Sequence, residues 1–243
     1  MTPPRHRSPS SKPARATLSL EQILATAVTI LDRDGIRGLT LRGLAQELGG
    51  GLGSIYWYVA GKDELLELAC DSLVGAALAR AESDPTAAQG GGTDVERAAA
   101  DVRRIALALF DQTQQHPWLA LQLQVQGAGS PNSLRYWERI GRALAAMGLT
   151  ARQQFDGSTA VSGYVAGVAA QMAAQDLQAD RERSKPEQLG EIVEGWLAND
   201  PVEFAWIHSM AEEFRTHDDA DQFTAGLDLL LSGLVRQATG ESG

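Results

Sequence analysis

Hydroxyl and aromatic groups crowd one short segment of this 243-residue chain, at Ser54, Tyr56, Trp57 and Tyr58. Between and after them lie Ile55 and Val59, which are four residues apart and suffice to bury one face of a short helix. The other side chains of the segment must then point outward. Exposed aromatic rings are unfavourable in water without a partner, whereas OH and NH groups suit phosphate oxygens and rings suit a thymine methyl group. The segment therefore predicts a surface that contacts DNA.

Two helices are expected to precede and position this segment. Over residues 20–31, apolar side chains recur at three- and four-residue spacing, which predicts an amphipathic helix capped by Ser19 or Thr17. Glycines then break the pattern, and Thr40 is placed to cap a second short helix that ends at glycine. Short helix, tight turn and short helix is the helix-turn-helix plan, in which the second helix lies in the DNA major groove.

Glycines at positions 49, 50, 51 and 53 connect the second helix to the aromatic segment. They make an unusually flexible connection, because glycine lacks a Cβ atom. Gly49 follows a helix, so we expect it to serve the C-terminal cap. For the other three, tight packing of the turn and an effect on base specificity are both open interpretations. After this segment, Lys62 begins a longer helix with acidic residues in its first turn, as the helix dipole favours.

The charge is distributed unevenly along the chain. The formal net charge is −10, which argues against a polyanionic partner, because DNA binding needs cations that displace counterions from phosphates. Residues 1–66 nevertheless carry eight Lys and Arg against six Asp and Glu, and Arg5, Arg7, Lys12 and Arg15 precede any acidic residue. Composition supports two interpretations of residues 1–17 equally: a solvated tail, or a flexible basic arm that touches DNA.

The rest of the sequence predicts an all-α protein, because no stretch shows the period-two alternation of a strand. Breakers delimit expected helices at 94–115, 117–125, 132–147, 151–178, 187–198, 201–214 and 217–238. No apolar run approaches the roughly 20 residues that cross a bilayer, and no secretory signal is recognisable. Cys70 is the only cysteine, which excludes an internal disulfide framework. We therefore expect a cytoplasmic protein that contacts no membrane.

Small residues follow one face of the expected helix 151–178, at Gly163, Ala166, Gly167, Ala170 and Ala174. Such a face lets another helix approach closely. The last expected helix carries an apolar stripe at Leu227, Leu230, Leu231 and Leu234. Two such helices from each of two subunits would make a four-helix dimer interface. Periodicity alone supports packing inside one chain equally well.

Residues 20–70 resemble the TetR family of bacterial one-component repressors. The resemblance lies in GIRGLTLRGLAQELG at residues 35–49 and in IYWYVAGKDELL at residues 55–66. The aromatic run, with weaker similarity of residues 152–178 and 217–236 to the family's dimer helices, is most similar to the tetracycline-repressor-like branch. This resemblance implies an all-α homodimer with a three-helix DNA-binding domain. It also implies a larger helical domain that binds a small molecule and then releases the operator.

The resemblance divides the chain into a flexible basic arm (1–17), a helix-turn-helix domain (18–64) and a ligand-binding and dimerisation domain (65–243). It implies operator contacts from the second helix and the recognition helix, by Thr40, Arg42, Ser54, Trp57 and Tyr58. Tyr56 and Lys62 would bind phosphates. The family usually has branched or polar residues where this chain has glycines 49–53, so fewer side chains reach base edges there. The seam of Gly163, Gly167, Ala170, Leu227, Leu230 and Leu234 would join the two subunits.

Bulky or amide side chains of the central helices are candidate effector contacts, although each also suits ordinary core packing. They are Ile105, Leu109, Phe110, Trp118, Gln122, Trp137, Tyr164 and Gln171. Ligand pockets are mostly apolar, with a few polar groups that orient the ligand. Where the tetracycline repressor's drug and metal contacts would fall, this chain has Ile105, Leu109 and Leu123. None of them binds metal, so we expect an apolar or aromatic effector, no magnesium–tetracycline complex and no cofactor.

Two other classes of function compete with this regulator. An enzyme is not expected, because the glycines lack the spacing of a phosphate-binding loop and no nucleophile turn is present. His208 and Glu212 could share a metal with His217, but such a trio is usually a set of surface residues. A helical protein-interaction module without sequence-specific DNA binding is the remaining alternative. Repression is the family default, and the sequence leaves activation open.

Overall fold

The computed structural model describes residues 18–84, 92–125, 129–178 and 183–240, and every regular element within these ranges is a helix. The helices are α1 (Leu20–Gly38), α2 (Leu41–Glu47), α3 (Leu52–Ile55), α4 (Lys62–Ser83), α5 (Asp94–Gln115), α6 (Pro117–Leu123), α7 (Pro131–Ala146), α8 (Ala151–Gln178), α9 (Lys185–Leu197), α10 (Ala205–Ser209), α11 (Ala211–Thr216) and α12 (Asp219–Thr239). The expected all-α fold class is confirmed. The expected basic arm, residues 1–17, lies outside the described ranges.

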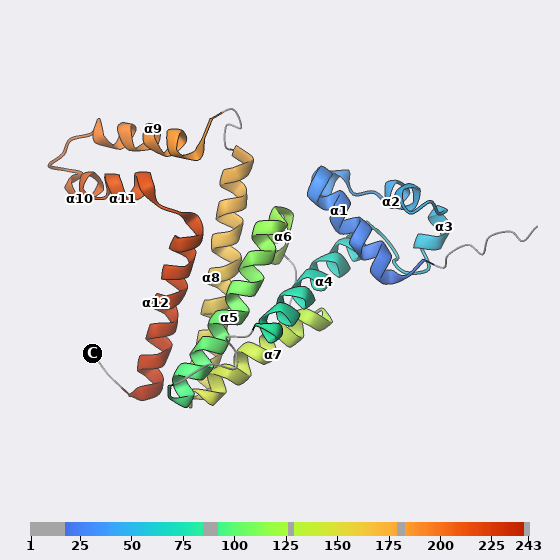
Figure 1. The fold of residues 1–243 in the computed structure, drawn as a ribbon, viewed down its shortest axis with the longest axis horizontal. Helices are drawn as coiled ribbons and strands as arrows, with labels where there is room; N and C mark the ends of the chain where they lie inside the picture. Colours follow the sequence, from blue (N-terminus) through green and yellow to red (C-terminus); the bar gives the residue numbers. More distant parts are fainter. Residues whose placement is uncertain (1–17, 85–91, 126–128, 179–182, 241–243) are drawn as a thin grey trace, which may run out of the picture.

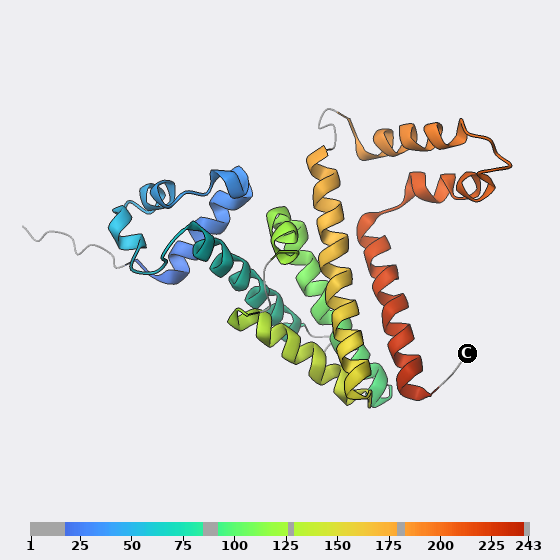
Figure 2. The ribbon, with the colours of Figure 1, turned by 180° about the vertical axis from the view of Figure 1, so that it is seen from behind.

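Helices α1–α3 gather at one end of the molecule around the first part of α4, which then runs into a bundle with α5, α7, α8 and α12 (Figure 1). Seen from behind, α9–α11 project sideways from the end of α8 and the start of α12, which lie at the same end of the bundle (Figure 2). The molecule therefore has a helix-turn-helix end, a central bundle and a projecting group of short helices.

Two hydrophobic cores divide within α4. The N-terminal core runs from Ile23 to Leu73, and the bundle core begins at Val74 and extends to Leu234. Two residues of α6, Trp118 and Leu119, are buried in the N-terminal core although they lie more than 40 residues beyond it in the sequence. Helix α6 therefore belongs structurally to both halves, because it also packs against α8 of the bundle.

Side-chain caps explain several helix starts. Ser19 and Gln22 form a capping box at α1, and the Thr40 hydroxyl accepts a hydrogen bond from the Gly43 amide, 3.0 Å away, at the start of α2. Both caps match the sequence-based expectation. Gly49, just after α2, has a φ of +64°, a left-handed conformation that favours glycine at a helix C-terminus. Its predicted structural role is therefore confirmed.

Two predicted helices were wrong in extent. The segment with the exposed aromatic residues, called here the recognition segment, covers residues 52–59. Its helix, α3, begins at Leu52 and ends at Ile55, so Tyr56, Trp57 and Tyr58 lie just after the helix, in the following turn. The expected helix 201–214 is replaced by a turn and two short helices, α10 and α11. The cause lies at Asp200, whose carboxylate accepts hydrogen bonds from the amides of Val202 and Glu203 at 2.7 and 3.1 Å. Because of this turn, the next helix begins only at Ala205.

Polar contacts fix α4 to the bundle. The buried Asp71 carboxylate accepts hydrogen bonds from the backbone amides of Asn132 and Ser133, at 2.9 and 3.0 Å. An acid of one helix thus caps the N-terminus of another, where free amides and the helix dipole favour a negative charge. Near the end of α4, the carbonyls of Leu78 and Ala81 accept hydrogen bonds from Arg139 and Arg104. Helix α4 is therefore held to α7 and α5 along much of its length.

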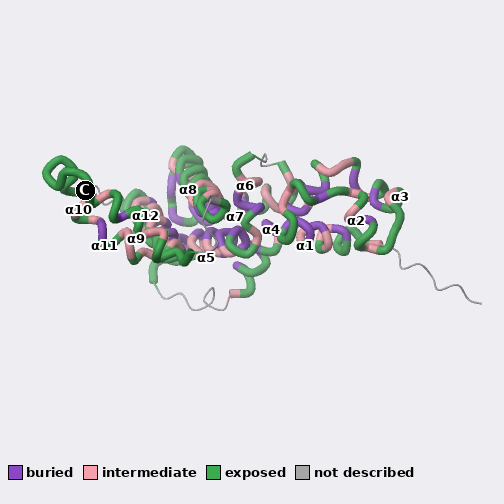
Figure 3. Tube along the Cα trace, turned by 90° about the horizontal axis from the view of Figure 1, so that it is seen from above, coloured by how far each residue is buried: buried purple, intermediate pink, exposed green. Residues whose placement is uncertain are grey.

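Helices α9–α11 make an arm that packs mainly on itself. Val193 and Ala211 are its buried apolar residues, and Trp196 contacts Phe214 with ring centroids 4.3 Å apart. The arm's remaining surface is largely exposed, in contrast to the buried interior of α5 (Figure 3). Val202 and Trp206, on the turn and on α10, are 86% and 70% exposed. Within the described ranges, no helix is long and apolar enough to cross a membrane.

Candidate nucleic-acid interface

Two fully buried side chains anchor the recognition segment, residues 52–59, in the N-terminal core. Ile55 and Val59 are buried, as their four-residue spacing predicts. They pack in the same core as Leu44 of α2 and Leu65 of α4. The backbone of the segment is therefore held by the core, and Ser54, Tyr56 and Trp57 remain exposed at the surface.

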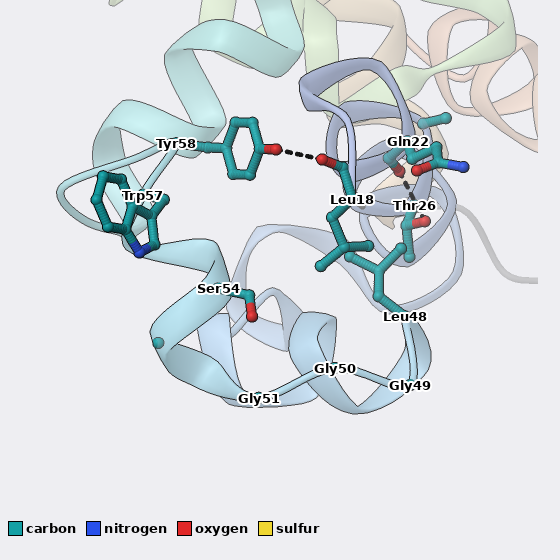
Figure 4. Close-up of a pocket in the computed structure, with 12 residues that line it drawn as sticks. Leu18, Gln22, Thr26, Leu48, Gly49, Gly50, Gly51, Ser54, Trp57 and Tyr58 are labelled. Carbon is teal, nitrogen blue, oxygen red and sulfur yellow. Dashed lines mark hydrogen bonds between the residues drawn. The ribbon is translucent and has the colours of Figure 1, made fainter. Parts of the chain in front are cut away.

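Trp57 and Tyr56 are the most prominent of these surface side chains, at 89% and 55% exposed. A groove of about 1560 Å³ lies beside them, between the first half of α1 and the turn that connects α2 to α3. Its lining includes Gln22 and Thr26 of α1, the backbone of glycines 49–51, and Ser54 (Figure 4). Amide, hydroxyl and backbone groups beside an exposed indole can bind phosphate oxygens and a base edge.

Tyr58 does not point outward as predicted. Its side chain is half-buried, and its hydroxyl donates a hydrogen bond across the groove to the Leu18 carbonyl (Figure 4). In the same view Trp57 points away from Leu18. The spacing of Ile55 and Val59 predicts the buried face correctly. It gives no sign that a third side chain, Tyr58, reaches the residues just before α1. The Tyr58 hydroxyl proton is therefore donated to another residue of the same domain and is not available to DNA.

Lys62 is also tied to the protein. Its ammonium donates a hydrogen bond to the carbonyl of Ile36, 2.6 Å away, near the end of α1. An ammonium has three donors, so the remaining two can still bind a phosphate. Thr40, Arg42 and Ser54, by contrast, are exposed, and Arg42 forms no ion pair with a described residue. The structure therefore brings most predicted DNA contacts to one end of the molecule and turns Tyr58 inward.

The N-terminal helices that carry the candidate interface are poor in free positive charge. Residues 18–69 contain four Lys and Arg against seven Asp and Glu. Arg33 is neutralised by Asp34 at 2.7 Å and Glu47 at 2.6 Å. The hydrogen bond from Arg33 lowers the pKa of Asp34, and the same contacts raise the pKa of the guanidinium. Cations for phosphate binding must therefore come from Arg37, Arg42 and Lys62, or from residues outside the described ranges.

A polar contact joins α1 to α6. Oδ1 of Asp32 on α1 lies 2.7 Å from the indole Nε1 of Trp118 and 2.8 Å from Nδ1 of His116. Trp118 was predicted to contact an effector. The structure buries it in the N-terminal core, apart from Ile105, Leu109 and Phe110 of the bundle core. No sequence signal pairs Asp32 with Trp118, because 86 positions separate them.

Most other effector candidates lie in the bundle. Ile105, Leu109 and Phe110 are buried in its core, Trp137 and Tyr164 pack against that core, and Gln122 is half-buried. Gln171 is exposed, so the structure does not place it with them. Phe110 stacks on Phe223 with centroids 3.7 Å apart, and Tyr164 stacks on Phe223 at 5.2 Å. The bundle core is thus rich in aromatic contact surface.

Sequence reasoning missed a buried pair of hydroxyl groups in this interior. The hydroxyl oxygens of Tyr136 on α7 and Ser162 on α8 are inaccessible to solvent, and the Ser162 hydroxyl is close enough to act on the Tyr136 hydroxyl as a hydrogen-bonding neighbour. Burial raises the pKa of the Tyr136 hydroxyl to about 12, because the phenolate is disfavoured away from water. Buried hydroxyl groups suit the polar contacts that orient a ligand. The sequence shows only an ordinary core position at Tyr136.

Two residues of the predicted dimer seam are buried inside their own chain. Leu227 and Leu234 are buried in the core of their own chain, so they are not free to meet a second subunit. Gly163 is exposed, and Gly167, Ala170 and Leu230 are half-buried. The large apolar side chains that do face outward are Leu229 of α12, 75% exposed, and Phe155 of α8. The regular spacing of the leucines led to their prediction as an interface, but Leu227, Leu231 and Leu234 face the interior of their own chain.

The three candidate metal ligands do not converge. His208 Nε2 lies 3.1 Å from the Asn199 carbonyl, whereas His217 Nδ1 lies 2.6 Å from the Phe214 carbonyl. No group of three His, Cys, Asp or Glu side chains that could hold a metal is present in the described ranges.

Comparison with known proteins gives two family matches that together cover most of the chain. Residues 23–69 match the family described as "Bacterial regulatory proteins, tetR family", and residues 94–238 match "Tetracyclin repressor-like, C-terminal domain". The HTH-type transcriptional repressor DrrR1 of Streptomyces coeruleorubidus is 32% identical over 248 residues, covering 97% of this chain and 85% of the relative. The class E tetracycline repressor protein of Escherichia coli is 35% identical over 71 residues, or 29% of this chain and 34% of that protein.

Solved structures agree with these two family matches. A transcriptional regulator described as a TetR from Streptomyces coelicolor has a TM-score of 0.75 at 38% identity, with 90% of this chain and 98% of that chain covered. ActR of Streptomyces coelicolor, in a crystal structure with actinorhodin, has a TM-score of 0.74 at 25% identity, with 94% and 100% covered. Both comparisons extend over the helix-turn-helix end and the bundle.

Proposed function

The chain belongs to the TetR family of bacterial transcriptional regulators, and from this premise we propose that it represses transcription as a homodimer on a palindromic operator. The observation that carries the proposal is the exposed Trp57 and Tyr56 pair on a turn fixed by the N-terminal core. Two copies of this turn would read successive major grooves, which lie about 34–36 Å apart. Trp57, Ser54, Thr40 and Arg42 are proposed to contact bases, and Tyr56 and Lys62 phosphates.

Dimerisation is proposed to use the outward face of α8 and α12. Leu229, Phe155 and the exposed Gly163 lie on these two helices, and small residues along α8 allow close approach of a second helix. The inward-facing Leu227 and Leu234 support the fold of each subunit. A two-fold axis between such faces would set the distance between the two recognition turns.

We propose that a small apolar or aromatic effector enters the bundle and releases the operator. Phe110, Tyr164 and Trp137 offer aromatic surface, and the buried hydroxyls of Tyr136 and Ser162 offer polar contacts. ActR, which has a similar fold, has been crystallised in complex with actinorhodin, and this supports a small-molecule effector for this chain. Effector binding would shift the population toward a spacing of the recognition turns that no longer fits DNA.

The basic residues before position 18 are proposed to supply phosphate contacts that the described domain lacks. Residues 1–17 hold four Lys and Arg and no acid, whereas residues 18–69 have an acidic excess. Each phosphate contact contributes about −0.9 to the slope of log K against log salt. Deleting residues 1–17 should therefore make the measured slope less negative. An unchanged slope would identify these residues as a solvated tail.

Selection of the full chain on a randomised DNA duplex pool tests the main proposal. We expect a palindrome to be enriched, bound by a dimer with an affinity that falls as salt rises. The contrasting function is a helical protein-interaction module. Absence of an enriched sequence, together with weak binding that does not respond to salt, would favour that module and contradict the proposed repressor.

A further inference from the structure

Asp32 occupies the contact between the DNA-binding half and α6. A single oxygen, Oδ1, is within hydrogen-bond distance of both Trp118 Nε1 at 2.7 Å and His116 Nδ1 at 2.8 Å. A carboxylate can only accept, so both ring nitrogens donate to it. Trp118 is buried and His116 is mostly buried, and both belong to the start of α6. Two planar rings from one short segment thus converge on one acidic side chain of α1.

This contact has directional consequences that apolar packing alone lacks. Trp118 and Leu119 already bury α6 in the N-terminal core, but apolar contacts are non-directional. Hydrogen bonds from two rings to one oxygen favour a narrow range of orientations between α1 and α6. Helix α6 also packs against α8, a helix of the proposed dimer face. The orientation of α1 relative to α8 is therefore set partly at Asp32.

We propose that Asp32 is a positioning residue for operator binding, which fixes the angle at which each DNA-binding domain is presented to its half-site. This inference rests on the proposed function, because it concerns a dimer that reads two half-sites at once. Asp32 is on the side of α1 that meets α6, so it acts through Trp118 and His116 and does not contact bases. Its loss should leave each domain able to bind a half-site while making simultaneous binding of two less favourable.

The experiment uses the full chain and two duplexes: the palindrome selected by the wild type, and the same duplex with one half-site scrambled. The variants are Asp32→Ala, which removes the acceptor, and Trp118→Phe, which removes the indole NH and keeps a buried ring. Asp32→Asn is the conservative variant, because its amide oxygen still accepts a hydrogen bond. Asp34→Ala is the matched control: it removes the same charge from α1, but the described contacts of Asp34 are with Arg33 on the same helix. Thermal unfolding of each variant checks that it folds.

We expect the affinity of Asp32→Ala for the palindrome to be lower than that of Asp34→Ala by about tenfold or more. Loss of hydrogen bonds to a charged group changes binding constants by this factor. Binding to the scrambled duplex should agree between the two variants within about twofold. Trp118→Phe should show the same selective loss, and Asp32→Asn should recover part of it. Asp32→Ala should also tolerate altered half-site spacing better than the wild type.

Other outcomes overturn the inference. An equal loss on both duplexes would mean that Asp32 merely stabilises the DNA-binding domain, and no loss on either would mean that the contact does not set the orientation. If Asp34→Ala behaves like Asp32→Ala, the effect is electrostatic. These results differ from a failure of the proposed function, in which the wild type itself would select no palindrome and both proposals would fall.

Discussion

Two parts of the molecule expose tryptophan, and they differ in what lies beneath. Trp57 follows α3, where Ile55 and Val59 are buried in a core shared with α1, α2, α4 and α6. Trp206 belongs to the α9–α11 arm, whose main contacts are within the arm. Trp57 is therefore proposed as a DNA contact because its backbone is held by the N-terminal core. Trp206 is comparably exposed, so exposure alone does not separate the two residues.

The largest expected difference between the two parts concerns stability. Leu119→Ala opens a cavity in the N-terminal core and should reduce the free energy of unfolding by about 2–5 kcal/mol. Val202→Ala in the arm should change it by no more than about 0.5 kcal/mol, because the side chain is 86% exposed. Urea unfolding measures both. Equal effects would mean that the arm is as firmly supported as the DNA-binding end.

Operator affinity should separate the two tryptophans next. Trp57→Ala should weaken binding of the selected operator by about 1–3 kcal/mol and alter sequence preference, with little change in melting temperature. Trp206→Ala provides the matched control and should leave operator affinity unchanged. As a further contrast with Trp57, Tyr56→Ala should weaken the binding of all DNA sequences alike, because Tyr56 is proposed to bind phosphate. The comparison fails if the Trp206 variant loses as much affinity as the Trp57 variant.

A smaller effect is expected at the acid that holds α4 to α7. Asp71→Asn keeps one acceptor for the amides of Asn132 and Ser133 but loses the charge that the helix dipole favours. The free energy of unfolding should fall by about 1 kcal/mol. Asp111→Asn is a suitable control, because its partner Arg80 is exposed and such pairs contribute about 0–1 kcal/mol. Denaturant titration of the two variants gives the contrast, and an equal loss would argue against a special role of the cap.

The smallest expected effect depends on pH and lies where the arm meets α12. Hydrogen bonds from the amides of Asp221 and Ala220 lower the pKa of the Asp218 carboxyl. Since this pKa is lower in the folded than in the unfolded chain, the contribution to stability is present above the unfolded value and is lost as pH falls through the folded value. Asp218→Ala should therefore reduce stability at neutral pH, and the deficit should shrink on acidification. Urea midpoints across this range, with Asp221→Ala as the control, test the sign.

Periodicity predicted the long helices well because their buried faces repeat over several turns. The bounds of α5 and α8 agree with the sequence-based ranges 94–115 and 151–178. Short elements were less predictable: the four-residue α3 has too few positions to show a period, and the turn at Asp200 depends on a local hydrogen bond that apolar spacing does not reveal. Side-chain placement failed where partners are remote. Tyr58 bonds to a carbonyl 40 positions earlier, and Trp118 to an acid 86 positions earlier.

The shortness of α3 has an evolutionary consequence. Only Ile55 and Val59 of the recognition segment are needed for burial, so exchange of the neighbouring outward residues leaves the core intact. Mutations at Ser54, Tyr56 or Trp57 can therefore accumulate without passing through unstable intermediates. After gene duplication, two descendants of this regulator would be able to diverge toward different operators while keeping the same fold and the same effector domain.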